Sequence, residues 1–257
     1  MRSYILNETN WKGVKQTDFQ VAVLPWGATE AHNYHLPYGT DNIIAERIAA
    51  KAAALATNLG GRVIVLPAIP FGVNTGQPDV KLDMNLNPGT QMMILRDLIT
   101  VLNRQGIHKM VILNAHGGND FRQIIRELNL IFPEMFLCQC NWFKIPGAED
   151  YFSDLGEHAG EVETSFMMYL APELVLPLAE AGDGKARIFA IPALNQGWAW
   201  AEREWTRVTN DTGIGNPALA TAEKGESFFN VVTEKIGGFL YELAVLNPAD
   251  FYKDKLC

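Results

Sequence analysis

The chain is poor in cysteine, which excludes a fold held together by disulfide bonds. Only three cysteines, Cys138, Cys140 and Cys257, occur among 257 residues. Cys138 and Cys140 alternate along one predicted strand, so they face the same side and are too close in sequence to bridge comfortably. We therefore expect reduced thiols and a cytoplasmic protein.

The sequence also lacks long apolar runs. A membrane-spanning helix needs ~20 consecutive apolar residues, but the richest run, residues 63–73, contains two prolines and a glycine. The N-terminus has no apolar core of the kind found in signal peptides. We therefore expect neither a membrane-spanning segment nor a secretory leader.

Clusters of Lys and Arg are absent as well. The 21 basic and 29 acidic residues give a formal net charge of −8. Nucleic acids and anionic membranes are bound by concentrated positive patches, so we expect neither as a partner. A small anionic substrate held by one or two local cations is compatible with this composition.

The sequence does contain a regular alternation of short apolar and longer amphipathic segments, without repeats. The apolar segments predict strands at residues 19–25, 62–69, 109–114, 135–142 and 186–191. The amphipathic segments predict helices at residues 42–58, 89–105, 119–132, 159–170 and 218–246. Apolar strands separated by helices are typical of a parallel sheet covered on both faces. We predict an α/β fold, a three-layer α/β/α sandwich with a mostly parallel sheet, formed by a single domain over residues 1–257.

Two loops of this predicted fold combine histidines with carboxylates or glycines. The loop after the first strand contains Glu30, His32, His35 and Asp41, and His116 directly follows the third strand. In parallel sheets, ligands bind beyond the carboxyl ends of the strands, where these loops start. Carboxylates and imidazoles without nearby cysteine suit Zn²⁺ or Mn²⁺. The pattern predicts a metal site, while any one of these histidines alone is equally typical of a solvated turn.

The segment His-Gly-Gly-Asn at residues 116–119 has two interpretations. Glycines between a strand and a helix often let backbone N–H groups hold a phosphate, but the segment matches neither common nucleotide-binding motif. In the other interpretation, the glycines let the backbone pass close to a metal held by His116.

A third acidic segment, "GEHAGEVETS", precedes the helix predicted at residues 159–170. Its adjacent Glu157 and His158 lie before the helix and are not explained as complements of the helix dipole. A metal-activated water needs a group that takes its proton and passes it to the leaving nitrogen. This pair is therefore a candidate for proton transfer.

Together these segments resemble the motifs of the creatininase (creatinine amidohydrolase) family. "LPWGATEAHNYHLPYGTD", "VILNAHGGN" and "EHAGEVETS" look like its first three motifs, and "GIGNPALATAEKGE" is also typical of it. The match is collinear and spans nearly the whole chain. The resemblance implies a two-metal centre and a homo-oligomer, with a hexamer favoured.

The resemblance also implies roles for single residues. The family's ligand positions match Glu30, His32, Asp41 and His116. Asp41 would bridge the two ions, and Glu157 and His158 match the catalytic pair. Creatininase itself uses a Glu two residues after the second-motif His, where this chain has Gly118. Glu163, in "ETS", matches the carboxylate of family members that have His-Gly-Gly-Asn in the second motif, so the resemblance implies Glu163 as the fifth ligand.

The chain also departs from the family pattern. Asn33 occupies a position that is usually Gly in the family's first motif. His35, in the same loop, is not a ligand position, and we expect it to support a metal ligand. Trp142, Trp198 and Trp200 could wall the substrate, as tryptophans do in creatininases, or form an oligomer interface. These departures argue against creatinine itself as the substrate.

We predict a metal-dependent amidohydrolase that cleaves a non-peptide C–N bond, cyclic amides included, in a small-molecule amide. It would carry two divalent ions per protomer, with Zn²⁺ favoured over Mn²⁺. The alternatives are a formamide hydrolase of a nucleotide or cofactor pathway and a peptidase of a modified peptide. A non-catalytic small-molecule binding protein is a further alternative, and it would be indifferent to chelators.

Overall fold

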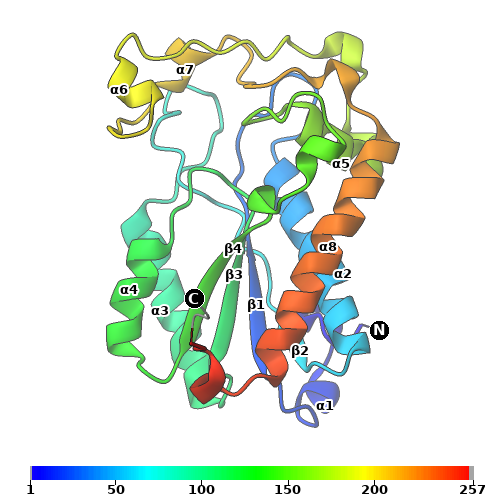
Figure 1. The fold of residues 1–257 in the computed structure, drawn as a ribbon, viewed down its shortest axis with the longest axis vertical. Coiled ribbons are helices and arrows are strands. Elements are labelled where there is room, and N and C mark those ends of the chain that lie inside the picture. The colour runs from blue at the N-terminus through cyan, green and yellow to red at the C-terminus, as the bar shows by residue number, and fades with distance from the viewer. Residues whose placement is uncertain (1, 255–257) are drawn as a thin grey trace.

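The computed structural model describes residues 2–254, and its centre is a four-stranded parallel sheet (Figure 1). The strands are β1 (Val21–Trp26), β2 (Val63–Val65), β3 (Lys109–Asn114) and β4 (Phe136–Asn141). They pair in the order β2-β1-β3-β4, and each neighbouring pair is parallel.

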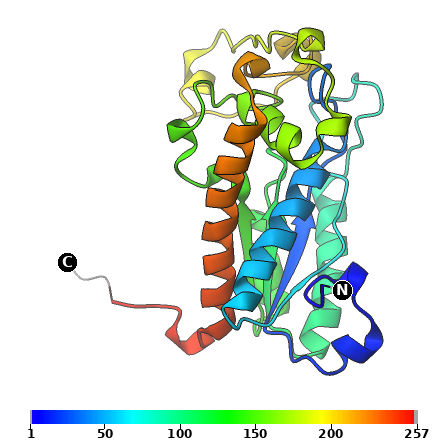
Figure 2. The same ribbon diagram turned by 90° about the vertical axis from the view of Figure 1, so that its right-hand side faces the viewer.

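Helices cover both faces of this sheet (Figures 1 and 2). One face is covered by α2 (Thr40–Asn58), α5 (Glu161–Leu170) and α8 (Ala222–Val245), and the other by α3 (Pro88–Arg104) and α4 (Arg122–Ile131). Three short helices are α1 (Trp11–Val14), α6 (Pro192–Asn195) and α7 (Trp205–Val208). The predicted three-layer α/β/α sandwich is confirmed.

The core is divided by the sheet because successive strand residues point to opposite faces. Val21 and Val23 of β1 belong to the apolar cluster shared with α2, α5 and α8. Ala22, Leu24 and Trp26 belong to the cluster shared with α3 and α4. Every residue of β1 is buried, as expected for a central strand covered on both sides.

Local sequence signals fix where several helices begin and end. Pro88 occupies the first position of α3, where its missing N–H costs nothing. The Thr221 side chain accepts a hydrogen bond from the Lys224 N–H at the start of α8. Gly60 follows α2 with a φ of 100°, a left-handed conformation that glycine adopts without strain.

The strand predicted at residues 186–191 is wrong. Ala186 makes only an isolated bridge with Thr209, and Ile188 and Ile191 are 81% and 58% exposed. This part of the chain lies with α6 and α7 above the carboxyl edge of the sheet, so it has no strand of the sheet beside it (Figure 1). The helix predicted from residue 42 begins two residues earlier, at Thr40, so Asp41 lies in its first turn.

Two further observations concern the cysteines and the helices. Cys138 and Cys140 are free thiols on β4, and Cys257 lies outside the described residues. Within residues 2–254, each helix is too short or too polar to cross a membrane.

Candidate metal centre

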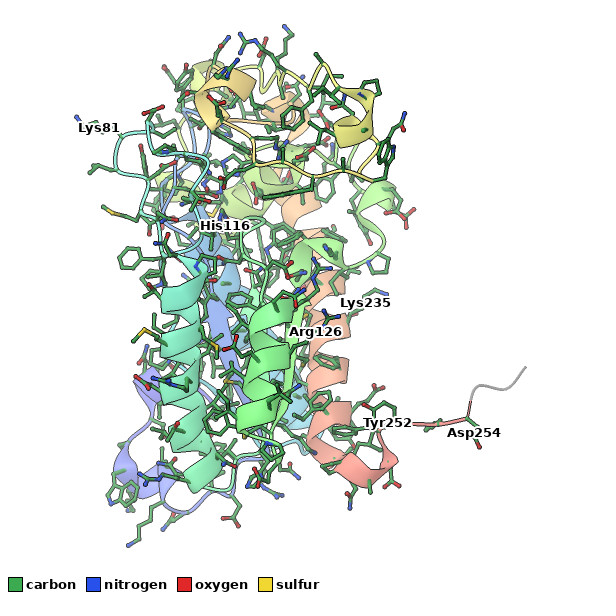
Figure 3. All side chains as sticks on the ribbon, turned by 90° about the vertical axis from the view of Figure 1, so that its left-hand side faces the viewer. Lys81, His116, Arg126, Lys235, Tyr252 and Asp254 are labelled. Atoms are coloured by element: carbon green, nitrogen blue, oxygen red, sulfur yellow. The ribbon has the colours of Figure 1, made fainter. Side chains whose placement is uncertain are left out.

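The sheet order brings together side chains from distant parts of the sequence. β1 and β3 are neighbours, so the loop that carries Glu30 and His32 starts beside the loop that carries His116. Asp41 lies in the first turn of α2 and Glu163 in the first turn of α5. Figure 3 shows His116 between the helical body of the molecule and the loops above it.

These five side chains form one compact cluster. His32 Nε2 lies 3.1 Å from Asp41 Oδ1 and 4.0 Å from Glu163 Oε2. His116 Nδ1 lies 2.9 Å from Glu30 Oε1 and 3.2 Å from Asp41 Oδ2. Each carboxylate oxygen of Asp41 therefore faces a different histidine. Glu30, His32 and Asp41 are almost completely inaccessible to solvent.

The donor atoms make up two overlapping groups that can each hold a metal ion. One group is Glu30, Asp41 and His116, and the other is His32, Asp41 and Glu163. Within each group, one donor atom per residue lies within 4.8 Å of the others. Asp41, the residue predicted to bridge two ions, belongs to both groups. A third group of Glu30, His32 and His158 places His158 against the same cluster.

Three histidines are held in a defined tautomer by backbone carbonyls. The pairs are His32 Nδ1 and Glu30 O at 3.1 Å, His116 Nε2 and Val73 O at 3.0 Å, and His158 Nε2 and Ala31 O at 2.8 Å. A carbonyl oxygen only accepts, so each of these nitrogens carries the hydrogen. The other ring nitrogen, which faces the carboxylates, keeps a free lone pair in the neutral form. Metal-ligating histidines typically have this arrangement.

The charges of the cluster favour a bound cation. Burial would lower the pKa of His32, but the carboxylates of Asp41, Glu163 and Glu30 outweigh it and raise this pKa to about 10. The pKa of His116 is also raised well above its usual value, against the effect of burial, chiefly by Glu30 and Asp41. Burial raises the pKa of Glu163. The buried Asp41 Oδ2 makes no hydrogen bond within the described residues. The buried carboxylates of Glu30 and Asp41, together with the less buried Glu163, thus favour positive charge at the cluster, which divalent ions would supply.

Gln77 supports the cluster, although no sequence motif marks it as part of the site. Its Nε2 donates to Glu30 Oε2 at 2.7 Å, which leaves Glu30 Oε1 facing His116. Gln77 is buried, although it lies in the long loop between β2 and α3. The only signal available was the polar character of that loop.

The two predicted catalytic residues lie in different surroundings. The His158 ring contacts Ala31 O and, through Nδ1, Glu30 Oε1 at 3.7 Å. The Glu157 side chain is 62% exposed and pairs with Arg203 at 2.9 Å. Among the described residues, the hydrogen bonds and ion pairs of His158 do not include the Glu157 carboxylate. The catalytic roles of both residues stay predictions.

A cavity of about 540 Å³ opens over the cluster, and both predicted catalytic residues line it. Trp200 is part of its wall although it is 85% exposed, and Trp198, which is 76% exposed, does not line it. Trp142 is buried and stacks on Phe166 with ring centroids 4.8 Å apart.

His35 and Asn33 fasten the first loop to other segments. His35 Nε2 lies 2.9 Å from Thr164 Oγ1, next to Glu163 on α5. Asn33 has a φ of 53°, a left-handed conformation that asparagine and glycine adopt more readily than other residues, and its side chain bonds to the backbone of Gly182. His35 thus supports the cluster through α5, not through a direct bond to a ligand within residues 2–254.

The chain is similar to known proteins in both sequence and fold. The Creatininase family model, described as creatinine amidohydrolase, matches residues 7–240. A crystal structure of a protein assigned as a creatinine amidohydrolase from Bacteroides fragilis NCTC 9343 superposes with a TM-score of 0.92 and 43% identity, covering 98% of this chain and 100% of that one. A mutant creatininase of the Zn-Zn type superposes with a TM-score of 0.76 at 22% identity, over 95% and 99% of the two chains, which shows the shared fold.

A relative with a different name is similar over most of the sequence. The mycofactocin precursor peptide peptidase of Mycobacterium ulcerans (strain Agy99) is 27% identical over 225 residues, which cover 80% of this chain and 79% of that protein. Because the family model matches most of the chain, the protein belongs to the creatininase family of hydrolases.

Proposed function

We propose that this protein is a metal-dependent amidohydrolase with two divalent ions per protomer. The observation that supports this most directly is the pair of ligand groups that share Asp41. Glu30 and His116 would complete one site, and His32 and Glu163 the other. The donors are carboxylate oxygens and imidazole nitrogens, which suit Zn²⁺ and, second, Mn²⁺. When bound, such ions acidify a water molecule and polarise a carbonyl oxygen.

His158 is the residue best placed to move the proton in this reaction. Hydrolysis adds water across the C–N bond, so the water oxygen joins the carbonyl carbon and a water proton must reach the departing nitrogen. His158 Nε2–H is occupied by Ala31 O, which leaves Nδ1 as the atom that accepts and returns the proton. Nδ1 lies beside the ligand Glu30 and His158 lines the cavity, so both ends of the transfer are within reach.

Two classes of amide are candidates for the substrate. The sequence favours a small non-peptide amide, cyclic amides and formamides included. The 27% identical relative is named a precursor peptide peptidase, and the 540 Å³ cavity exceeds the needs of a compact ring, which supports a peptide amide. Both classes undergo the same reaction at the same cluster.

Metal analysis tests the proposed function first. The protein, purified without chelator or a metal-affinity tag, is expected to contain close to two equivalents of zinc or manganese per chain. Chelation should abolish hydrolysis of a panel of cyclic amides, formamides and peptide amides, and the metal should restore it. A chain that contains no metal and takes up none on titration would contradict the proposal and favour the binding protein.

Two substitutions test the sharing of Asp41. Asp41→Asn weakens both ligand groups, so we expect it to lose most of both ions. Glu163→Gln weakens one group, so we expect it to retain about one equivalent, since Glu30, Asp41 and His116 persist. Metal content per chain measures both, and His108→Gln, outside the groups, is the control. Equal loss in the two variants would contradict the shared-ligand arrangement.

A further inference from the structure

A second cavity reaches the metal cluster from another side. It has a volume of about 370 Å³, and Asp41 and Glu163 belong to its wall. The two cavities share the residues Glu30, His116, Gly117, Phe143, Glu157 and His158. Two of the proposed ligands, Glu30 and His116, and the predicted proton-transfer residue His158 therefore lie where the two cavities meet.

The walls of the two cavities differ in chemistry. Apart from the metal ligands, the smaller cavity is lined mainly by apolar side chains, which include Trp142, Leu155, Val162 and Phe228. The larger cavity is lined by many amide and charged side chains, which include Asn74, Asn119, Arg122, Lys144, Glu202 and Arg203. A ligand that fills both cavities would therefore meet an apolar environment on one side of the cluster and a polar one on the other.

Most charged groups of the larger cavity already have partners. Arg203 pairs with Glu157, and Arg122 pairs with Asp120. Lys144 forms no ion pair within the described part of the chain. It is therefore the cation that can bind a polar or anionic group of a ligand without breaking an existing ion pair.

We propose that the substrate is an amide with two unlike arms, one apolar and one polar, on the two sides of the scissile C–N bond. This inference rests on the proposed function and names the substrate class. The scissile bond lies at the shared wall, the apolar arm packs against Leu155, and the polar arm reaches toward Lys144. A compact amide such as a small ring fills neither cavity and gains none of this binding energy.

A panel of matched amides tests the two arms. It contains phenylacetyl-glycine and succinyl-benzylamide, which carry unlike arms in the two orientations, and succinyl-glycine and N-benzyl-phenylacetamide, whose arms are alike. Formamide and a small cyclic amide serve as compact references. We expect kcat/KM for at least one unlike-armed amide to exceed that of every other class by about tenfold or more, the usual size of a filled apolar pocket.

Two variants locate the arms on the protein. Leu155→Ser should lower kcat/KM for the preferred amide about tenfold, and Lys144→Met should raise its KM about tenfold. Leu130→Ser and Lys235→Met carry the same exchanges at exposed positions that line neither cavity, and they should leave the rates unchanged.

The outcomes separate the inference from the proposed function. Hydrolysis of compact or like-armed amides at least as fast as unlike-armed ones would overturn the inference and leave the amidohydrolase intact. A preference for unlike arms that neither variant reduces would also overturn it, because the cavities would then not hold the arms. A metal-loaded chain that hydrolyses no amide would overturn the proposed function, and the inference with it.

Discussion

At the scale of single residues, each histidine of the cluster has one nitrogen fixed and one free. His158 shares this arrangement with His32 and His116, so its geometry alone fits both a metal ligand and a proton carrier. The two roles differ in what the site needs. Both ligand groups that share Asp41 have three donors without His158, whereas hydrolysis needs a residue that carries a proton.

Replacing His158 distinguishes these two roles. In His158→Gln the side-chain amide can still donate to Ala31 O, but no basic nitrogen remains. We expect unchanged metal content and a kcat lowered by about 10²–10⁴-fold, the usual size of a proton-transfer contribution. Steady-state kinetics and metal analysis on the same sample measure both quantities. Loss of one metal equivalent would make His158 a ligand and contradict the assigned role.

Gln77 acts through Glu30, and its removal should weaken metal binding without removing a ligand. In Gln77→Leu, Glu30 Oε2 loses its hydrogen-bond donor and the carboxylate is free to turn. Partners of metal ligands typically contribute 10–100-fold to metal affinity, so we expect a weakening of about that size. Competition with a chelating dye measures it. Thr75→Ala, in the same loop but hydrogen-bonded to Glu202 instead, should keep the native affinity.

At the scale of elements, the two glycines of the loop after β3, Gly117 and Gly118, differ in the space around them. A Cβ at Gly118 would lie 2.3 Å from Val73 O and 2.5 Å from His116 Nε2, the two atoms that hydrogen-bond to each other. A Cβ at Gly117 meets nothing within 4 Å. Gly118 therefore lets His116 reach the backbone carbonyl that orients it.

Alanine at each position tests this difference. Gly118→Ala should displace the His116 ring, weaken metal binding by the group of Glu30, Asp41 and His116 at least tenfold and lower activity to a similar extent, with about one equivalent of metal retained by the other group, whereas Gly117→Ala should retain the native metal content. Metal analysis and kinetics of the two variants, with circular dichroism as a control for folding, give the comparison. Equal effects would show that the loop, and not the contact at Gly118, controls the site.

Much of this element arrangement could be predicted from the sequence. Continuous apolar strands predicted the parallel sheet, and the carboxyl-edge rule brought the His32 and His116 loops together. The failure at residues 186–191 has a physical cause. Apolar residues such as Ile188 raise strand propensity, but a strand also needs a partner strand, and propensity carries no information about one.

Other parts of the site depended on information that the sequence pattern does not carry. Glu163 lies in the first turn of α5, not after a strand, so only the family resemblance placed it at the cluster, whereas His158 was indicated by its place beside Glu157 before that helix. Gln77 lies in a loop without regular structure and donates a hydrogen bond to the carboxylate of Glu30, which is 47 residues away in the sequence. Arg203 likewise reaches Glu157 from a separate segment. Such contacts follow from tertiary packing of loops, which has no sequence period.

At the scale of the whole molecule, the cluster joins the two loops of the sheet edge to the first turns of α2 and α5. Its ligands come from residues 30–41, 116 and 163, so bound ions would cross-link four elements. Ions that bind only the folded chain stabilise it by about 2.7 kcal/mol at a hundredfold excess over Kd. In their absence, protonated histidines must balance the carboxylates, and stability then depends on pH.

This dependence has a definite sign in the metal-free protein. The pKa of His32 is 6.5 in an unfolded chain and about 10 in the fold, because the surrounding carboxylates outweigh the effect of burial. Its contribution to stability is therefore fully present below pH 6.5 and is lost as the pH rises toward 10, and His116 acts in the same direction.

We expect the free energy of unfolding of the chelated protein, from urea titrations at constant ionic strength, to fall steadily between pH 7 and 9. The slope of this free energy against pH reports the number of protons released on unfolding. His32→Gln should reduce that number by about one, and His108→Gln should leave it unchanged. Metal ions compete with protons for the same nitrogens, so the extra stability of the metal-loaded protein should increase over this range. A metal-free protein equally stable at pH 7 and 9 would show that the carboxylates do not hold protons on these histidines, and that the cluster does not need a cation.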